Sequence, residues 1–462
     1  MTENKYDLIV IGAGSAGFAA ARTAASLGKR VALVDRGPFG GLCILRGCMP
    51  SKTLIRSSEL NYLVRHSEEL GIRVRGVDLD YPGIVSRKDR IIAGFADHRF
   101  QDVKNNPNID LIDGEARFIS PHELQIGNLQ IRSEKFVIAA GSKVFVPEIP
   151  GLHDAGFITS NEALDLKELP RSLGIIGGGV IALELGQHFS RMGVEVHLFF
   201  RSRTVLSWED EETGFGIEKY LTDEGIRFHP ESAYEQVERD EKGLKVLSIR
   251  SQDRVESYPF DEILLAAGRV GYCDHLNLEA TRAEYSEQGI AVNDEMETNI
   301  SHIFAAGDVT GIYHLAHVAV YQGEIAGHNA VSAEKRKANY RLVPEIIFTD
   351  PLFARIGMNE KEAEGSGKRF VTASFPFDDL GKAICTGKTK GFVKMIADSK
   401  SGEILGVTIL GPEADNLIHE MVVALHFKAT VREFLQIPHF HPTLSEILTY
   451  PAEEILLKLN SR

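Results

Sequence analysis

The sequence predicts an α/β protein with two copies of a βαβ unit, followed by a separate α+β domain. A Gly-rich turn follows an apolar run twice, and both Gly12 to Asp35 and Gly177 to Phe200 span 23 residues. A repeat at this distance indicates a duplicated domain rather than a solenoid. After about residue 340, alternating strands precede a helix near residues 415–428, which is typical of an α+β domain.

The first βαβ unit begins almost at the start of the chain. An apolar run from Tyr6 to Ile11 leads into GAGSAG, an Ala-rich helix to about Ser26, and a strand from Arg30 to Val34. A glycine triplet between strand and helix, with an acid about 20 residues on, is the fingerprint of a dinucleotide site. The pyrophosphate is expected at the helix N-terminus and a ribose hydroxyl on the acid. The predicted contacts are Gly12, Gly14, Gly17 and Asp35.

The second unit carries the same turn but ends differently. In LGIIGGGVIALELG the corresponding positions are Gly177, Gly179 and Ala182. Phe200 stands where the ribose-binding acid is expected, and two arginines, Arg201 and Arg203, follow it. Two guanidiniums without a carboxylate favour a 2′-phosphate, so NADP(H) is predicted over NAD(H). The alternative is that both arginines are ordinary solvated surface charges.

Three further apolar runs end on Ala-Ala-Gly, in FVIAAGSK, ILLAAGRV and IFAAGDVTG. Such turns bring the backbone close to a neighbour or a ligand. Gly141 and Gly268 are therefore predicted to contact a cofactor.

Composition is ordinary for a globular enzyme and excludes several classes of protein. The chain has 462 residues, 43% hydrophobic and 25% charged, which predicts three or four domains. A net charge of −14 argues against a nucleic-acid partner. No apolar run is long enough for a membrane span, and the early strand leaves no room for a signal peptide. Four cysteines do not make a secreted disulfide framework, so a cytoplasmic location is expected.

Cys43 and Cys48, in GGLCILRGCMPSK, are predicted to form a redox-active disulfide that exchanges electrons with a flavin. Their four intervening residues close a small ring, which an attacking thiolate opens readily. Arg46 and the helix expected after Cys48 both favour a thiolate. Inert buried thiols and half a zinc site are the alternatives, but the other two cysteines are distant and isolated. No metal site is predicted.

HFHPTLSE, near the C-terminus, allows three interpretations. His439 and His441 flank a single residue, as a metal pair does. Thr443 and Glu446 instead have the spacing of a helix cap. The third interpretation is a histidine base oriented by a carboxylate, the usual partner of thiol chemistry. The residues alone leave the last two nearly even.

Together these motifs resemble the class I pyridine nucleotide-disulfide oxidoreductases, which include dihydrolipoamide dehydrogenase, glutathione reductase and mercuric reductase. The markers run through essentially the whole chain in family order: GAGSAG, GGLCILRGCMPSK, GGGVIALELG, AAGRV, AAGDVTG and HPTLSE. The resemblance implies a glutathione reductase-like fold with two Rossmann-like domains and a C-terminal dimerisation domain. Its expected parts are an FAD domain (1–142), an NAD(P) domain (143–272), a central part completing the FAD domain (273–339) and an interface domain (340–462).

The resemblance also implies roles for the cofactor-binding residues. FAD occupies the first site, and Asp308 matches the residue that binds its ribityl chain. Lys52 matches the lysine near the reactive ring nitrogen, and Glu184 matches the carboxylate partner of that lysine. NAD(P)H binds the second site.

For catalysis, the resemblance makes Cys48 the flavin-side thiolate and Cys43 the outer thiol that attacks substrate. His441, with Glu446, matches the acid–base histidine, which the other subunit of a homodimer supplies. The expected substrate is a small dithiol or disulfide, or a lipoyl-bearing protein.

Several departures from the family pattern leave the substrate open. Leu42, Leu45 and Arg46 replace a Thr, an Asn and a small apolar residue of the usual cysteine loop. HPTLSE looks most like dihydrolipoamide dehydrogenase, whereas the nicotinamide site looks like the NADPH-using glutathione reductases. Mercuric reductases and large thioredoxin reductases need a C-terminal redox pair that nothing after Cys385 supplies, and transhydrogenases lack the full cysteine pair. A dihydrolipoamide dehydrogenase-like enzyme is favoured, with an NADPH-dependent reductase of another small disulfide and a non-catalytic component or redox sensor as alternatives.

Overall fold

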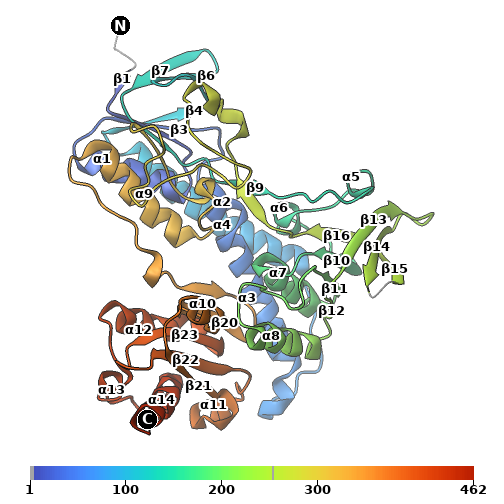
Figure 1. Cartoon of the computed structure of the whole chain (residues 1–462). Coiled ribbons are helices and arrows are strands. Elements are labelled where there is room, and N and C mark those ends of the chain that lie inside the picture. Colours follow the sequence, from blue (N-terminus) through green and yellow to red (C-terminus); the bar gives the residue numbers. More distant parts are fainter. Residues whose placement is uncertain (1–4, 252–253, 462) are drawn as a thin grey trace.

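The computed structural model describes residues 5–251 and 254–461 and confirms the predicted α/β class (Figure 1). A five-stranded parallel sheet with the order β18-β8-β2-β3-β4 forms its first half. Its strands are β2 (Leu8–Ile11), β3 (Val31–Asp35), β4 (Ile109–Asp113), β8 (Phe136–Ile138) and β18 (Ile303–Ala305).

Both faces of this sheet are covered. Helices α1 (Ser15–Ser26) and α9 (Ala316–Val331) share one hydrophobic core with one face. The other face packs against a second sheet, β1-β7-β6-β5. Its strands are β1 (Lys5–Tyr6), β5 (Ala116–Ser120), β6 (Glu123–Ile126) and β7 (Leu129–Ser133). Three more helices of this half are α2 (Gly41–Arg46), α3 (Cys48–Arg65) and α4 (Tyr81–Lys104).

The second βαβ unit forms a four-stranded parallel sheet, β12-β11-β10-β16. Its strands are β10 (Ser172–Ile176), β11 (Glu195–Phe199), β12 (Arg227–His229) and β16 (Glu262–Leu265), and its longer helices are α7 (Val180–Arg191) and α8 (Glu211–Asp223). An antiparallel sheet of β13 (Ala233–Arg239), β14 (Lys245–Ser251) and β15 (Arg254–Phe260) extends from it. The connections to the first half hold α5 (Leu152–Ala155), α6 (Ser160–Ala163) and the pair β9 (Ser142–Val144) and β17 (Arg269–Gly271).

The C-terminal domain lies below the first unit and to the left of α8 in Figure 1, and it is built on an antiparallel sheet, β19-β20-β23-β22-β21. Its strands are β19 (Glu345–Ile347), β20 (Leu352–Gly357), β21 (Phe370–Pro376), β22 (Phe392–Asp398) and β23 (Ile404–Gly411). Its helices are α10 (Glu360–Gly365), α11 (Gly381–Thr386), α12 (Ala414–His426), α13 (Val431–Phe434) and α14 (Thr449–Asn460). Short 3₁₀ turns occupy 67–70, 274–276, 278–280, 308–310, 340–342, 377–379 and 444–448.

Most predicted elements lie within a few residues of their expected ends. The first helix ends at Ser26 as expected, and the helix predicted near 415–428 is α12. The domain boundaries near residues 142, 272 and 339 stay a prediction. None of the helices in the described part of the chain is long and apolar enough to cross a membrane.

Candidate active site

The first Gly-rich turn is closed so tightly that only glycine fits it. Gly12 has φ +101°, and a Cβ there would lie 2.3 Å from the carbonyl oxygen of Ala139. A Cβ on Gly17 would lie 1.7 Å from the carbonyl oxygen of Gly12. Gly14 is the N-cap of α1, so the unpaired N–H groups at the start of this helix lie beside the Gly-rich turn. This arrangement is a ready-made anion site for a pyrophosphate.

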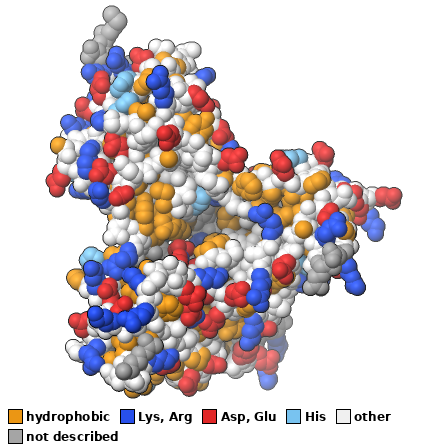
Figure 2. All heavy atoms as spheres, in the orientation of Figure 1, with side chains coloured by type: hydrophobic (Ala, Val, Ile, Leu, Met, Phe, Trp, Pro, Cys, Tyr) orange, Lys and Arg blue, Asp and Glu red, His pale blue; other side chains and the backbone are white. Residues whose placement is uncertain are grey.

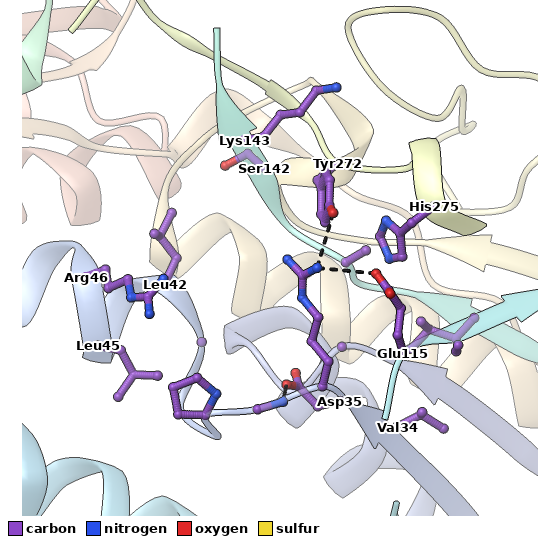
Figure 3. A pocket seen from close by; sticks show the side chains of 18 of the residues that line it. Val34, Asp35, Leu42, Leu45, Arg46, Glu115, Ser142, Lys143, Tyr272 and His275 are labelled. Carbon is purple, nitrogen blue, oxygen red and sulfur yellow. Dashed lines mark hydrogen bonds and ion pairs between the residues drawn. The ribbon is translucent and has the colours of Figure 1, made fainter. Parts of the chain in front are cut away.

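Asp35 ends β3 beside that turn. Its carboxylate accepts the N–H of Ala13 at 2.5 Å and the N–H of Gly37 at 2.8 Å. These bonds fix its orientation, and each carboxylate oxygen keeps a second lone pair for a hydroxyl donor. A cavity of about 350 Å³ opens here, and Figure 3 shows Asp35 and Leu42 on its wall.

Another part of the cavity wall comes from residues that follow two of the Ala-Ala-Gly turns, Ser142 and Arg269. The hydroxyl of Ser142 donates to Asp308 at 2.6 Å, and Arg269 donates to the same hydroxyl at 2.8 Å. Burial lowers the pKa of Arg269, against the effect of the Asp308 carboxylate. Gly141 and Gly268 precede Ser142 and Arg269, and each has open space where a Cβ would point.

The cysteine loop rests directly on the first turn. A Cβ on Gly41 would lie 2.4 Å from the Cα of Gly14, so the two backbones touch without an intervening side chain. Gly41 opens α2, which carries Cys43, and Cys48 opens α3. The loop is thereby held beside the predicted dinucleotide site.

Cys43 and Cys48 are half-buried free thiols that interact with each other. The hydrogen bond from Cys43 is the main cause that lowers the pKa of Cys48 to about 7, and the nearby Lys52 acts in the same direction. The same hydrogen bond, with burial, raises the pKa of Cys43. The pair therefore favours a thiolate at Cys48 and a thiol at Cys43. Arg46, the cation expected to act here, is exposed and instead lowers the pKa of Glu162 to a small extent, after that carboxylate's hydrogen bonds with Thr159.

Lys52 lies one turn after Cys48 on α3 and is ion-paired. Its Nζ is 2.6 Å from Oε2 of Glu184, which belongs to α7 of the second unit. Glu184 is 4% exposed, and its other oxygen accepts the N–H of Phe348 at 3.0 Å. The ring of Phe348 lies 4.6 Å from Nζ of Lys52. The ion pair of Lys52 and Glu184 therefore connects α3, the helix that begins at Cys48, to the second βαβ unit.

The second Gly-rich turn repeats the tight packing of the first. A Cβ on Gly177 would lie 2.2 Å from the carbonyl oxygen of Ala266, Gly179 is the N-cap of α7, and Ala182 is fully buried. Phe200 is a core residue with no polar group to offer a ribose. Arg201 and Arg203 are both exposed after β11, and Arg203 pairs with Glu211 at 3.1 Å.

In the histidine motif, the carboxylate of Glu446 contacts both a histidine and the cap residue Thr443, so two of the three predicted interpretations hold together. Oε1 of Glu446 is 2.9 Å from Nδ1 of His441, while its Oε2 accepts the N–H of Thr443 at 2.8 Å. The bond from Thr443 is the main cause that lowers the pKa of Glu446, followed by the contact with His441. His439 faces a different carboxylate, Glu420, at 2.8 Å. Within residues 5–251 and 254–461, no group of three or more His, Cys, Asp or Glu side chains is placed to hold a metal.

The chain does not bring His441 to its own cysteines. The side chain of His441 is 79% exposed, and its segment packs on α14. Figure 1 places α13 and α14 at the bottom of the molecule and α2 far above them.

Several polar residues of the cavity were not predicted. Arg36 donates to Glu115 at 3.3 Å and to the hydroxyl of Tyr272 at 3.2 Å, which are the dashed lines in Figure 3. These residues come from three distant segments, and no sequence pattern joins them. Arg269 could have been found, because it directly follows one of the Ala-Ala-Gly turns.

Comparison with known proteins identifies the family. The family model described as pyridine nucleotide-disulphide oxidoreductase matches residues 6–323, and the model of its dimerisation domain matches residues 343–452. A dihydrolipoyl dehydrogenase of Chlamydia muridarum is 33% identical, over 99% of this chain and 97% of that protein. A mercuric reductase of Staphylococcus aureus is 34% identical, over 93% of this chain and 79% of that protein. The chain belongs to the class I pyridine nucleotide-disulfide oxidoreductases, as its motifs predicted.

The fold agrees with this assignment. The HOCl-induced flavoprotein disulfide reductase RclA from Escherichia coli matches with a TM-score of 0.87 and 29% identity, over 97% of this chain and 99% of that chain. The protein is thus an enzyme of a family of FAD-binding disulfide oxidoreductases. Relatives with different names have nearly equal identities, so similarity alone does not select a substrate.

The residues of the first site fit FAD. The tight turn with the open N-terminus of α1 suits a pyrophosphate, and the fixed carboxylate of Asp35 suits a ribose. Asp308 accepts the hydroxyl of Ser142, which lines the cavity, and keeps acceptor capacity for a further hydroxyl.

Proposed function

We propose that this protein transfers electrons between NAD(P)(H) and a dithiol or disulfide substrate through Cys43 and Cys48, with dihydrolipoamide dehydrogenase as its nearest functional match. One observation carries the proposal. The two cysteines interact with opposite shifts of pKa, in a loop whose backbone touches the first dinucleotide turn.

Each cysteine has a distinct task in the proposed reaction. In the reducing direction, Cys43 loses its proton and attacks one sulfur of the substrate, which releases the other sulfur as a thiolate. Cys48 then attacks Cys43, so that the protein disulfide forms and the second substrate thiolate leaves. A low pKa suits Cys48, because it must be a thiolate near neutral pH.

The proposed FAD ligands are the glycines of the first turn, Asp35 and Asp308. When bound, FAD supplies a path for an electron pair between the nicotinamide and the cysteine pair. The nicotinamide is assigned to the second turn, at Gly177, Gly179 and Ala182. Lys52, held by Glu184, places a cation one turn from Cys48, between the cysteine loop and the second unit.

His441 is assigned as the acid–base group, with Glu446 holding its Nδ1 and leaving Nε2 free to exchange a proton with the substrate sulfur. Because His441 lies far from its own cysteines, we assign it to the site of a partner subunit in a homodimer. Large apolar side chains exposed in the C-terminal domain support this, among them Phe427 at 75% and Phe440 at 80%. Figure 2 shows hydrophobic side chains gathered around a hollow between the upper half of the molecule and this domain.

Mixed dimers test the shared site. Cys43→Ser and His441→Gln proteins should each be inactive, whereas unfolding and refolding them together should restore activity, because a mixed dimer contains one site with both native residues. If the mixture stays inactive while dimers of both chains form, His441 does not act across the interface.

Steady-state rates with lipoamide and with glutathione disulfide, each with NAD(H) and NADP(H), test the substrate. Turnover of lipoamide with either nicotinamide supports the dihydrolipoamide dehydrogenase-like activity. Absence of turnover with NAD(H) and with NADP(H) excludes it. The second candidate, an NADPH-dependent reductase of another small disulfide, is favoured by Phe200 and the two arginines after β11. A non-catalytic redox component is the third candidate, and unchanged turnover in Cys48→Ser would favour it.

A cytoplasmic location is proposed, supported by the scarcity of cysteines.

A further inference from the structure

An aromatic side chain lies beside the Gly-rich turn of the second βαβ unit. Trp208, the only tryptophan of the chain, is 45% exposed on the segment between β11 and α8. Its Cη2 lies 3.8 Å from the position that a Cβ on Gly179 would take, and no other side chain from elsewhere in the described chain is within 4 Å of that position. Gly179 is the N-cap of α7, so the indole borders the unpaired N–H groups that suit a pyrophosphate.

The duplication of the βαβ unit places Trp208 in a position that already has a function in the first unit. Counted from the two Gly-rich turns, Gly41 corresponds to Leu206, and two residues further on Cys43 corresponds to Trp208. The φ angles of Gly41 and Leu206 are both positive, at 71° and 51°. The N–H of Leu206 donates to the carbonyl of Gly178 at 3.0 Å. In each unit, therefore, the segment after the second strand returns to its own Gly-rich turn and carries a side chain to it.

The C-terminal domain holds the backbone on both sides of the indole. The carbonyl of Trp208 accepts the side-chain N–H of Asn359 at 3.0 Å, and Asn359 is fully buried as the N-cap of α10. The carboxylate of Asp210 accepts the backbone N–H groups of Glu360 and Lys361, both at 3.2 Å. The indole thus projects from a fixed turn, and a side chain held in place before binding loses little entropy when a ligand covers it.

The indole itself has no partner in the protein. It offers a flat apolar face and one N–H donor. Within residues 5–251 and 254–461, its ring makes no aromatic, cation–π or hydrogen-bond contact. The nearby Arg203 packs over Phe215 instead, with its guanidinium 5.5 Å from the centre of that ring. Both the face and the donor of Trp208 are therefore available to a bound dinucleotide.

We propose that Trp208 forms one wall of the nicotinamide dinucleotide site, where its indole packs against the pyrophosphate and the adjoining ribose, and that Asn359 of the C-terminal domain positions it. The inference rests on the proposed function for the assignment of the nicotinamide dinucleotide to the second turn. NAD(H) and NADP(H) share the pyrophosphate, so the indole should contribute equally to the binding of both. Arg203, by contrast, is expected to act on the 2′-phosphate alone.

Equilibrium binding tests the wall without turnover. Calorimetric titration of the oxidised holoenzyme with NADP⁺ and with NAD⁺ gives the two dissociation constants. Trp208→Ala should raise both about tenfold, because the apolar contact with the indole is lost. Trp208→Phe keeps a ring and should stay within about threefold of wild type. The matched control is Val255→Ala, which removes a side chain that is 55% exposed on β15 of the same unit and should change neither constant.

The emission of the single tryptophan reports the contact directly. Collisional quenching by acrylamide measures how much of the ring the solvent reaches. Saturation with NADP⁺ or NAD⁺, neither of which absorbs tryptophan emission, should lower the quenching constant of the holoenzyme about twofold, because the cofactor covers one face of the ring. An unchanged quenching constant at saturation would mean that the cofactor does not touch Trp208, and the wall would be wrong.

A double-variant cycle tests the role of the C-terminal domain. Asn359→Asp keeps an acceptor for the N–H of Glu362 at the start of α10 but loses the donor to the carbonyl of Trp208. It should raise both dissociation constants about threefold in the native background. It should have no further effect in Trp208→Ala, because no indole is left to position. Equal effects in both backgrounds overturn the positioning role of Asn359.

The outcomes separate this inference from the proposed function. Normal binding of both nucleotides to Trp208→Ala overturns the wall and leaves the proposed function intact. Failure of NADP⁺ and NAD⁺ to bind the wild-type holoenzyme removes the nicotinamide site from the proposed function, and the wall with it. Loss of the dimer in Trp208→Ala by light scattering, with nucleotide binding unchanged, would instead assign the indole to a subunit interface.

Discussion

The ion pair of Lys52 and Glu184 gives opposite predictions for its two members, which makes it a sharp test of the electrostatics at Cys48. Lys52 lies four residues after Cys48 on one helix, so their side chains start about 6 Å apart. With an effective dielectric constant of about 40, a unit charge at that distance is worth roughly 1.4 kcal/mol, or one pKa unit. Glu184, 2.6 Å from Nζ, now offsets much of the effect of Lys52.

Removing the carboxylate should unmask the lysine. Glu184→Gln keeps an acceptor for the N–H of Phe348 and should lower the pKa of Cys48 from about 7 to roughly 6. Lys52→Met leaves the buried carboxylate alone near the sulfur and should raise that pKa to roughly 8 or above. The double variant should lie near the wild-type value, because both charges are gone.

The pKa is measured from the pH dependence of iodoacetamide labelling at Cys48. A Cys43→Ser background removes the competing thiol and keeps a hydroxyl that can donate to Cys48. Arg56→Met, which removes an exposed cation one further turn along α3, is the matched control and should leave the pKa almost unchanged. Shifts of the same sign in Glu184→Gln and Lys52→Met, or an equal shift in the control, would refute this account.

Three other predictions concern charges away from the cysteines. Burial raises the pKa of Glu209 to about 7, above the value near 4.3 of an unfolded chain, so its stabilising protonated form is lost as pH rises through 7. In urea titrations, the unfolding free energy of Glu209→Gln minus that of wild type should therefore rise by about 2 kcal/mol from pH 5 to pH 8. Parallel pH profiles of the two proteins would contradict this. Arg203→Ala should raise KM for NADPH about tenfold without a matching change for NADH, and equal effects on both would remove the 2′-phosphate site. His441→Gln should lower kcat about 100-fold or more with the dimer intact by light scattering, and a smaller loss would exclude general acid–base catalysis.

Local patterns were enough to predict both nucleotide turns. A strand, a Gly-rich turn and a helix lie next to one another in the chain, so the tight contacts at Gly12 and Gly177 follow from adjacent residues and one returning strand. His441 and Glu446 are also close in sequence, but their spacing fitted a helix cap and a histidine–carboxylate pair nearly equally, and the structure contains both contacts. Contacts of this kind can be predicted from the sequence because the residues that form them are close together in the chain.

Contacts between distant segments were not visible in the same way. Only the family resemblance paired Lys52 with Glu184, because the two residues lie 132 residues apart and no local pattern joins them. Arg36, Glu115 and Tyr272 belong to no motif, and they meet only because distant segments line one cavity. The meander β13–β15 was also not predicted, since short alternating segments with many charges resemble loops.

The backbone contact between Gly14 and Gly41 determines where the sulfur atoms lie. Because no side chain separates the two loops, the height of the sulfur atoms above the nucleotide turn is a property of the main chain. Substitutions of neighbouring side chains such as Leu42 and Leu45 would therefore leave the distance between the cysteine loop and the first Gly-rich turn unchanged.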